Sequence, residues 1–316
     1  MKAPTKRKLG QTDVAVTEFG FGGAPLGELF VPVPEAQAQE TLAAAWEGGI
    51  RYYDTAPFYG YGKSEHRLGH FLRQQPRDEY ILSTKIGRVF TPTRDAATFD
   101  PGGWVGGLPF EFHYDYSYDG VMRSWEDSMQ RLGLASVDLL LIHDLDGFFW
   151  ETEQKLSAFE QQLRASGWRA LEELKRDGRI RAIGAGINCS PAIPRLLDLV
   201  DLDFFIVAMP YTLLDQAVLD DEFPRCQKQG VGIVIGSPFA SGILVTGPVA
   251  GARYAYGIAS EEIMERTRQI EAVCASHDVA LPCAAIHFAL AHPSVAAIIP
   301  GGFQAQHVRQ NLSFYQ

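Results

Sequence analysis

Cysteine is scarce in this chain, and its spacing argues against two classes of protein. The 316 residues include only four cysteines, and no two of them form a Cys-x-x-Cys pair or show the spacing of a zinc site. This pattern is not that of a disulfide-rich secreted domain or of a cysteine-rich metal protein. We expect a cytoplasmic protein without a metal site. Its cysteines, expected to be free thiols, are Cys189, Cys226, Cys274 and Cys283.

The chain also lacks a net positive charge and long apolar runs. The formal net charge is -10, which argues against a polyanionic partner such as nucleic acid, although a local basic pocket is compatible with it. No apolar run approaches the roughly 20 residues that a membrane-spanning helix needs. The segment Met1 to Gly10 is basic, but no apolar core follows it, so it does not read as a signal peptide. We therefore expect neither nucleic acid nor a membrane as a partner, while the oligomeric state is open.

The sequence does contain a regular alternation of short apolar runs with longer helical patterns. Several runs are apolar throughout, which is typical of parallel strands covered on both faces. Eight such strands alternating with helices predict an α/β fold, a (β/α)8 TIM barrel formed by residues 1–316 as a single domain. A doubly wound open sheet is the alternative. The expected strands are Phe19–Gly23, Arg51–Asp54, Tyr80–Lys85, Asp138–His143, Ile180–Ile187, Phe204–Val207, Val231–Ile235 and Ala296–Ile299.

The helical patterns carry their own start and stop signals. A helix over 34–49 has Pro34 near its start and glycines just past its end. The next pattern, over 64–74, opens at Ser64 as the expected N-cap. Before the first strand, residues 8–20 read as a β-hairpin with a turn near 11–13. Further helices are expected over 118–133, 155–178 and 281–293.

Ionisable side chains follow the ends of three expected strands. Asp54, Lys85 and His143 each end a strand, and Tyr59 comes five residues after Asp54. In a barrel these positions meet at the mouth formed by the carboxyl ends of the strands. A buried lysine needs a carboxylate, which Asp54 supplies. A nearby ammonium would lower the pKa of Tyr59, so that the phenol exchanges a proton with an alcohol or a carbonyl near neutral pH.

Each of these residues has an ordinary structural interpretation when it is taken alone. Asp54 fits a cap, Tyr59 a loop aromatic, Lys85 a surface residue and His143 a core histidine. The four positions together, however, match one family. The chain resembles the aldo-keto reductases over nearly its whole length, through "KLGQTDVAVTEFGFGG", "GIRYYDTAPFYGYGKSEHRLG", "ILSTKIG", "LGLASVDLLLIHD" and "IPGGFQAQHVRQNL".

This resemblance implies roles for the four residues and a nicotinamide cofactor. Tyr59 would be the general acid/base, Lys85 and Asp54 would tune it, and His143 would position the substrate oxygen. The cofactor would carry the hydride. The sequence has no GxGxxG fingerprint, because Pro25 and Cys189 stand at the third glycine of its near matches, which weakens the open-sheet alternative.

The resemblance also indicates where the cofactor would bind. "IGSPFASGIL" resembles the pyrophosphate loop of the family, in which backbone N–H groups and hydroxyls bind phosphate. Many relatives carry an aromatic that stacks on nicotinamide where this chain has Gly236. Asn188 is the candidate for the nicotinamide carboxamide. The expected residues of the loop are Ser237, Phe239, Ser241 and Gly242; an ordinary glycine-rich loop is the plain alternative.

The segment after the last strand indicates which cofactor, NAD or NADP, the protein prefers. Relatives that prefer NADP commonly carry a basic residue and an arginine where this chain has Gly301 and His307. Without them a 2′-phosphate loses its charged partners. Arg309 is nearby and able to compensate, and Gln310 with Asn311 fits an adenine-contacting pair. We expect NAD, with NADP possible.

The region that would form the substrate wall is rich in aromatics. The stretch over 86–120 is long and rich in glycine and aromatic residues, which in a compact domain indicates a functional loop. Candidate substrate contacts are Trp104, Tyr116, Phe148 and Trp150, and simple loop packing explains each of them equally well. "YDYSYDG", "HD" and "GSPFASGIL" resemble the branch of the family that contains D-threo-aldose 1-dehydrogenases (L-fucose dehydrogenases) and pyridoxal 4-dehydrogenases.

This branch implies oxidation of a small cyclic hemiacetal, a sugar or pyridoxal, to a lactone with NAD. The alternatives are an NADPH-dependent reductase of aldehydes or ketones and a non-catalytic nicotinamide-binding subunit. "PFYGYGKS" is a near match to a phosphate-binding P-loop, but Pro57 replaces its first glycine. His66 and His70 have metal-ligand spacing on a helix without a convincing third ligand.

Overall fold

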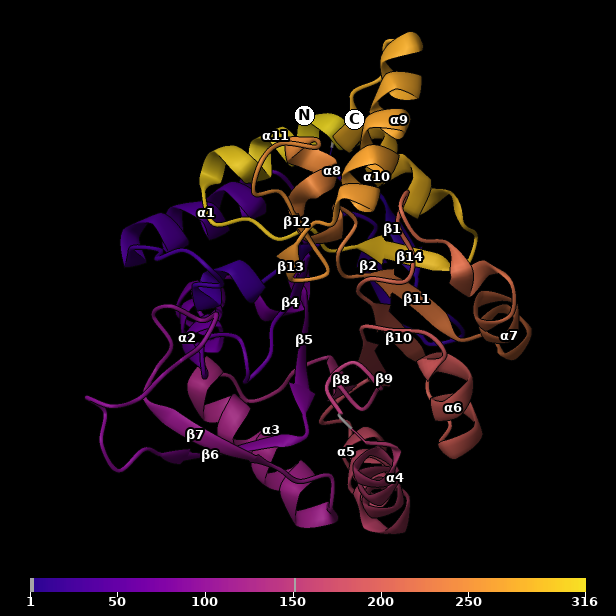
Figure 1. The fold of residues 1–316 in the computed structure, drawn as a ribbon. Helices are drawn as coiled ribbons and strands as arrows, with labels where there is room; N and C mark the ends of the chain where they lie inside the picture. Colours follow the sequence, from indigo (N-terminus) through magenta and orange to yellow (C-terminus); the bar gives the residue numbers. More distant parts are fainter. Residues whose placement is uncertain (1–2, 151) are drawn as a thin grey trace.

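The computed structural model describes residues 3–150 and 152–316, and its centre is a parallel β-barrel (Figure 1). Eight strands follow one another in the order β14-β11-β10-β9-β8-β5-β4-β3, and every neighbouring pair is parallel. Parallel bridges from Phe19 to Ile298 and from Gly22 to Gly301 join the two edges. The predicted TIM barrel is confirmed, and the open sheet is wrong because no edge is left unpaired along this ring. The strands are β3 (Phe21–Gly22), β4 (Tyr52–Asp54), β5 (Ile81–Ile86), β8 (Leu139–His143), β9 (Ala182–Ile187), β10 (Phe204–Val207), β11 (Gly232–Ile235) and β14 (Val295–Ile298).

Helices surround the barrel and bury its outer face (Figure 1). The long pattern over 155–178 forms two helices joined by one π-helical turn, 163–167. α9 was not anticipated, and it projects from the body of the molecule (Figure 1). The helices are α1 (Glu35–Glu47), α2 (Lys63–Leu72), α3 (Tyr118–Leu132), α4 (Glu153–Gln162), α5 (Trp168–Arg176), α6 (Ala192–Leu199), α7 (Glu222–Gln229), α8 (Ile243–Thr246), α9 (Glu261–Ser276), α10 (Leu281–Ala291) and α11 (Ala305–Tyr315). Short 3-10 turns lie at η1 (Ala24–Gly27), η2 (Arg77–Glu79), η4 (Ala217–Leu219) and η5 (Ala240–Gly242).

Two apolar cores hold this architecture together. The larger lies between the strands and the helices, and the smaller fills the barrel. The predicted N-terminal hairpin, β1 (Lys6–Lys8) with β2 (Ala15–Thr17), is confirmed. Its residues Leu9, Val14 and Val16 belong to the inner core. The hairpin therefore closes the amino-terminal end of the barrel, and the opposite end is left for chemistry.

Two further hairpins stand over the carboxyl end. The stretch expected to be a long loop over 86–120 contains an antiparallel pair, β6 (Arg88–Pro92) and β7 (Phe110–Tyr114). A shorter pair, β12 (Arg253–Tyr254) and β13 (Gly257–Ile258), follows α8. Both lie on the face shown in Figure 1, beside the strand ends.

The predicted cap of α2 is wrong. Gly62 is the N-cap residue, and Ser64 lies inside the first turn. The Ser64 hydroxyl donates to the carbonyl of Gly23 at 2.8 Å and pairs with the hydroxyl of Thr55 at 2.9 Å. The Ser64 hydroxyl therefore does not cap its own helix. Its bonds instead join α2 to the loops at the barrel mouth.

No single helix among the described residues is long and apolar enough to cross a membrane. Helices α9 and α10 reach that length and composition only as a pair, and they are bent by 94° at the break between them.

Candidate active site

A buried lysine forms the centre of the site at the carboxyl end of the barrel. Lys85, 2% exposed, donates from Nζ to Oδ2 of Asp54 at 2.7 Å and to the Thr55 carbonyl at 2.8 Å. Its third bond goes to the hydroxyl of Tyr59, 3.1 Å away. Ser83 donates to the other oxygen of Asp54 at 2.6 Å. The ammonium is thus fully satisfied, and it holds the phenol of Tyr59 at a fixed place.

Tyr59 lies in the loop between β4 and α2, under aromatic neighbours. Its ring centroid is 5.6 Å from Trp104 and 5.8 Å from the His143 ring, which stands nearly perpendicular at 83°. Strand ends β4, β5 and β8 therefore bring Asp54, Lys85 and His143 together around Tyr59. The four predicted catalytic residues form one cluster.

The expected fall in the pKa of Tyr59 is wrong for this structure. Burial raises the pKa of Tyr59 well above its usual value, and the carboxylates of Asp54 and Asp144 act in the same direction. Arg88 opposes them. Because Asp54 neutralises Lys85 at 2.7 Å, the ammonium does not outweigh the loss of water around the phenol. Tyr59 is a phenol at neutral pH.

His143 is buried, with 7% of its surface exposed, and is held from behind by Arg88. Nδ1 of the imidazole lies 3.1 Å from Nη1 of Arg88. Burial lowers the pKa of His143 well below its usual value, and the charges of Arg88 and Lys85 lower it further. His143 is therefore a neutral imidazole, suited to donate one hydrogen bond.

A polar network continues from Arg88 into the loop after β8. Asp144 accepts from Arg88 at 2.7 Å and, through Oδ1, from Nδ2 of Asn188 at 2.9 Å. Oδ1 of Asn188 accepts from the hydroxyl of Tyr256 at 3.1 Å. Burial and repulsion from Asp144 raise the pKa of Asp146 to about 6. Both ends of the Asn188 amide are thus engaged by protein groups, and a carboxamide would have to compete with Tyr256 for it.

A cleft of about 240 Å³ is joined to this network through Ser241, whose hydroxyl accepts from the backbone N–H of Tyr256 at 3.0 Å. Of the expected loop residues, Ser241 and Gly242 line it, whereas Ser237 and Phe239 lie just before it in the chain. Arg253 lines the same cleft and stacks on Phe30, with Cζ 4.0 Å from the ring centroid. Hydroxyls and a guanidinium are donors that suit phosphate oxygens. These side chains are therefore the ones that could hold the phosphates of a bound cofactor.

The residues expected to select the dinucleotide lie at the barrel seam and on α11. Gly301 is exposed, and a Cβ built there would lie 2.6 Å from Cγ of Pro25. His307 is half-buried, and burial lowers its pKa, so its ring is neutral. The expected adenine pair is split, since Gln310 is exposed and Asn311 buried.

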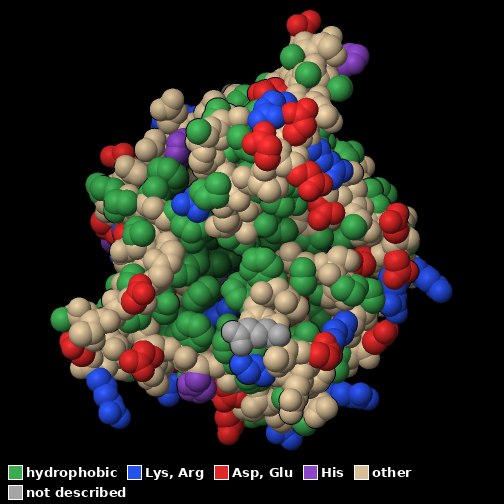
Figure 2. Space-filling view, in the orientation of Figure 1, with side chains coloured by type: hydrophobic (Ala, Val, Ile, Leu, Met, Phe, Trp, Pro, Cys, Tyr) green, Lys and Arg blue, Asp and Glu red, His purple; other side chains and the backbone are tan. Residues whose placement is uncertain are grey.

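The hollow beside β4 and β13 has hydrophobic side chains around it (Figure 2). Trp104, 7% exposed, covers Tyr59. Phe148 is exposed and packs on Tyr256, with centroids 5.9 Å apart. Both belong to loops at the mouth.

Two other candidate substrate contacts are placed differently. Tyr116 is fully buried and donates to the His143 carbonyl at 2.7 Å, so it supports the site from beneath and presents no surface to a substrate. Trp150 donates from Nε1 to the Asp144 carbonyl at 3.0 Å and packs on Tyr114. These aromatics are bound into the framework that holds His143 and Asp144.

Sequence reasoning missed Arg88, Arg253 and Tyr256. Arg88 comes three residues after Lys85, inside the stretch taken as a loop, so only its closeness to the strand end could have marked it. Arg253 and Tyr256 lie on a hairpin of two-residue strands that no periodicity signals.

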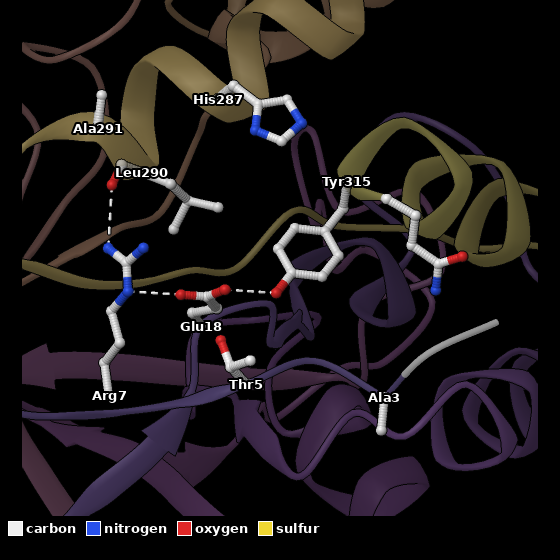
Figure 3. A pocket seen from close by; sticks show the side chains of 9 residues that line it. Ala3, Thr5, Arg7, Glu18, His287, Leu290, Ala291 and Tyr315 are labelled. Carbon is white, nitrogen blue, oxygen red and sulfur yellow. Dashed lines mark hydrogen bonds and ion pairs between the residues drawn. The ribbon is translucent and has the colours of Figure 1, made fainter.

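A second hollow, of about 420 Å³, lies at the amino-terminal end of the barrel, where Arg7 of β1 donates to the carbonyl of Val295 at the start of β14. Figure 3 shows the side chains that line it. Three of its polar side chains bind one another. Arg7 forms an ion pair with Glu18 and donates to the carbonyl of Leu290 at 2.9 Å, and Tyr315 donates to Glu18. This hollow shares no residue with the tetrad formed by Asp54, Tyr59, Lys85 and His143.

Comparison with known proteins agrees with the geometry. The model of the aldo/keto reductase family matches residues 18–316. The pyridoxal 4-dehydrogenase of Microbacterium luteolum is 40% identical, over 100% of this chain and 94% of that protein. The D-threo-aldose 1-dehydrogenase of a Pseudomonas species is 38% identical, over 95% of this chain and 90% of that protein. The holo form of an aldo-keto reductase from Bacillus halodurans superposes with a TM-score of 0.77 at 25% identity, over 99% and 91% of the two chains.

A closed parallel barrel and these relatives define an oxidoreductase that acts on CH–OH groups. The chain belongs to the aldo/keto reductase family, whose enzymes use nicotinamide cofactors. The resemblance drawn from the sequence is confirmed.

Proposed function

We propose that this enzyme oxidises a cyclic hemiacetal, an aldose such as L-fucose or else pyridoxal, to a lactone with NAD as hydride acceptor. The observation that carries the proposal is the position of the Tyr59 hydroxyl. It lies 3.1 Å from Lys85, whose ammonium also binds Asp54 and the Thr55 carbonyl. A phenol so placed, at a cleft mouth and beside a neutral imidazole, is arranged for proton transfer.

The proton chemistry follows from these residues. In the oxidative direction the Tyr59 phenolate takes the proton of the hemiacetal hydroxyl, the C–H bond of the same carbon breaks, and a C=O bond forms. Bound NAD would accept the hydride at nicotinamide C4. Lys85 stabilises the phenolate while it exists, and His143 donates a hydrogen bond to the reacting oxygen. The products are a lactone, reduced cofactor and one proton.

The names of the relatives support the substrate class. Besides the pyridoxal and D-threo-aldose enzymes, the L-galactose dehydrogenase of Arabidopsis thaliana is 30% identical over 97% of this chain and 86% of that protein. Sugars of this kind and pyridoxal share a ring with a hemiacetal carbon. The exposed ring of Phe148 offers a flat apolar surface that suits such a ring.

Two features support NAD over NADP. A basic side chain at position 301 would clash with Pro25, because a Cβ there lies 2.6 Å from Cγ. At position 307 the half-buried His307 has a lowered pKa, so it offers no cation to a 2′-phosphate.

Reduction of an aldehyde or ketone is the second candidate, and the state of Tyr59 favours it. Burial raises the pKa of Tyr59 well above its usual value, so the group is a phenol, the form that donates a proton to a carbonyl. The NADH-specific methylglyoxal reductase of Escherichia coli is also a relative, at 26% identity over 98% of this chain and 92% of that protein.

The test is a substrate panel with both cofactors. Oxidation is assayed with NAD and with NADP on L-fucose, D-arabinose, L-galactose and pyridoxal. Reduction of simple aldehydes is assayed with NADH and with NADPH. The proposal expects reduction of NAD with a sugar or pyridoxal. Turnover confined to simple aldehydes with NADPH would replace it by the reductase, and cofactor binding without any turnover would indicate a non-catalytic subunit.

A further inference from the structure

Arg88, at the start of β6, places a buried cation directly behind His143. The residue is 3% exposed, and its Nη1 lies 3.1 Å from Nδ1 of His143. Its other terminal nitrogen, Nη2, lies 2.7 Å from Oδ2 of Asp144 and 3.1 Å from the hydroxyl of Tyr114. Aromatic faces enclose the guanidinium, with Phe58 4.2 Å from Cζ. The group is thus fixed by charge, hydrogen bonds and rings at once.

This contact decides where His143 carries its proton. A guanidinium has N–H donors and no acceptor, so the Nδ1 atom beside it must accept. A neutral imidazole has one N–H, and that proton therefore belongs on Nε2. Oδ2 of Asp144 lies 3.4 Å from Nε2, longer than the usual N–H···O distance of about 2.7–3.2 Å, so an Nε2–H stays available to a substrate oxygen. Since burial, Arg88 and Lys85 all lower the pKa of His143, a second proton is absent at neutral pH.

We propose that Arg88 is a positioning residue that holds His143 as its Nε2–H tautomer, so that this N–H is the donor to the substrate oxygen. The inference rests on the role of His143 in the proposed function. With the proton on Nδ1 instead, Nε2 would present a lone pair to the substrate oxygen, and two acceptors would face each other.

The geometry explains why an arginine stands here. Two different nitrogens of one planar group reach His143 and Asp144 at 3.1 and 2.7 Å. A lysine ammonium is a single point charge, and it cannot keep both distances in this fixed pocket. A purely structural role, neutralising buried Asp144, would need only the charge. Arg88→Lys therefore separates the orientation of His143 from the neutralisation of Asp144, because it keeps the charge but loses the two terminal nitrogens that reach both residues.

The tautomer can be read in the free enzyme, without substrate. Long-range 1H–15N spectra near pH 7 distinguish Nε2–H, Nδ1–H and doubly protonated imidazoles, and loss of a signal in His143→Gln assigns His143. His292 is an internal reference, since its Nδ1 accepts from the Ser294 N–H at 3.2 Å and Arg88 does not touch it. We expect wild-type His143 to show the Nε2–H pattern, as His292 does. A proton on Nδ1, or on both nitrogens, overturns the proposal even if no variant folds.

Variants then test whether Arg88 is the cause. In Arg88→Lys we expect the His143 signals to move towards Nδ1–H or a mixture, with those of His292 unchanged. Tyr114→Phe is the matched control, because it removes one partner of Arg88 and leaves the contact to His143, so the Nε2–H pattern should persist. An unchanged His143 pattern in folded Arg88→Lys overturns the proposal.

Kinetics supply a separate readout. Loss of one preorganised donor to a reacting oxygen costs roughly 100- to 1,000-fold in kcat, and a partial loss should cost roughly tenfold or more. Arg88→Lys should show that fall in kcat, with KM for the cofactor little changed. If the spectra show the expected tautomer change but no panel substrate turns over, the proposed function fails and the role of Arg88 stands. If hemiacetals turn over while His143 carries its proton on Nδ1, the role of Arg88 fails alone.

Discussion

The hydroxyl of Tyr256 donates to Oδ1 of Asn188 at 3.1 Å and so engages an amide that the family resemblance assigns to the cofactor. Tyr256 stands at the tip of the β12–β13 hairpin in a left-handed conformation, with φ 66°. Its backbone N–H donates to Oγ of Ser241 at 3.0 Å, beside the cleft that Ser241, Gly242 and Arg253 line. One residue thus contacts both ends of the proposed cofactor site.

This contact predicts that Tyr256→Phe binds NAD more tightly. Freeing the amide of Asn188 removes a competing hydrogen bond, and one such bond is worth about 0.5–1.5 kcal/mol, or up to roughly tenfold in Kd. Titration calorimetry with NAD measures the change. Tyr254→Phe, on the same hairpin, is the control and should leave Kd unaltered. Weaker binding by Tyr256→Phe would mean that the hydroxyl belongs to the cofactor site itself.

Tyr59→Phe is predicted to abolish most of the turnover and to spare cofactor binding. The variant lacks the hydroxyl that Lys85 holds at 3.1 Å and that we propose transfers the proton. We expect a loss of roughly 100- to 10,000-fold in kcat. The ring and its contact with Trp104 stay, so Kd for NAD should be conserved. Unchanged kcat would refute the role of Tyr59.

The raised pKa of Tyr59 predicts opposite pH profiles for the two directions. At neutral pH the residue is a phenol, because burial and two carboxylates disfavour its charged form. Oxidation needs the phenolate, so its rate should climb by about tenfold per pH unit on the alkaline side until the raised pKa is reached. Reduction needs the phenol and should hold level over the same range. Rates in both directions between neutral and alkaline pH, with Tyr59→Phe as the baseline, provide the check. A flat oxidative profile would show that another group takes the proton.

The barrel and its tetrad were predictable because both follow local rules. Apolar runs such as "VDLLLIH" are long enough to be recognised as strands, and strand ends fix where Asp54, Lys85 and His143 point. The order of strands follows from right-handed βα connections. These inferences needed no knowledge of distant contacts.

The missed residues of the site depend mainly on contacts far apart in sequence. Arg88 meets His143 across 55 residues, and Tyr256 meets Asn188 across 68. Ser64 was expected to cap its helix and instead bonds Gly23, 41 residues away. The pKa of Tyr59 was misjudged for the same reason, since burial depends on loops that only the folded chain brings over the mouth.

His307→Arg is predicted to improve NADP binding. The present side chain is half-buried and has a lowered pKa, so it is uncharged at neutral pH. A permanent guanidinium at this place would offer charge-assisted hydrogen bonds to a 2′-phosphate, worth about 1.5–3 kcal/mol, or roughly 10- to 100-fold in Kd for NADP. NAD should be little affected, because it lacks that phosphate. The Kd ratio of the two cofactors, measured by fluorescence quenching in wild type and variant, gives the answer. The control for added charge is His287→Arg, an exposed change at the opposite end of the barrel. An equal gain in NADP affinity in that variant would contradict a specific role for position 307.

Two glycines of β9 predict contrasting effects on stability. Both point into the barrel, like Ala182 on the same strand. A Cβ at position 184 would lie 2.6 Å from the ring of Phe204, whose place in the inner core is fixed. A Cβ at position 186 would meet its nearest neighbour, Cε of Lys85, at an ordinary 3.6 Å. Overpacking a filled core costs about 1–3 kcal/mol, so Gly184→Ala should lower the free energy of unfolding by that amount. Gly186→Ala should leave it nearly unchanged. Urea unfolding of both variants and the wild type measures the difference. Equal stability of the two variants would show that Phe204 can move aside and that the barrel interior is less tightly packed than these distances imply.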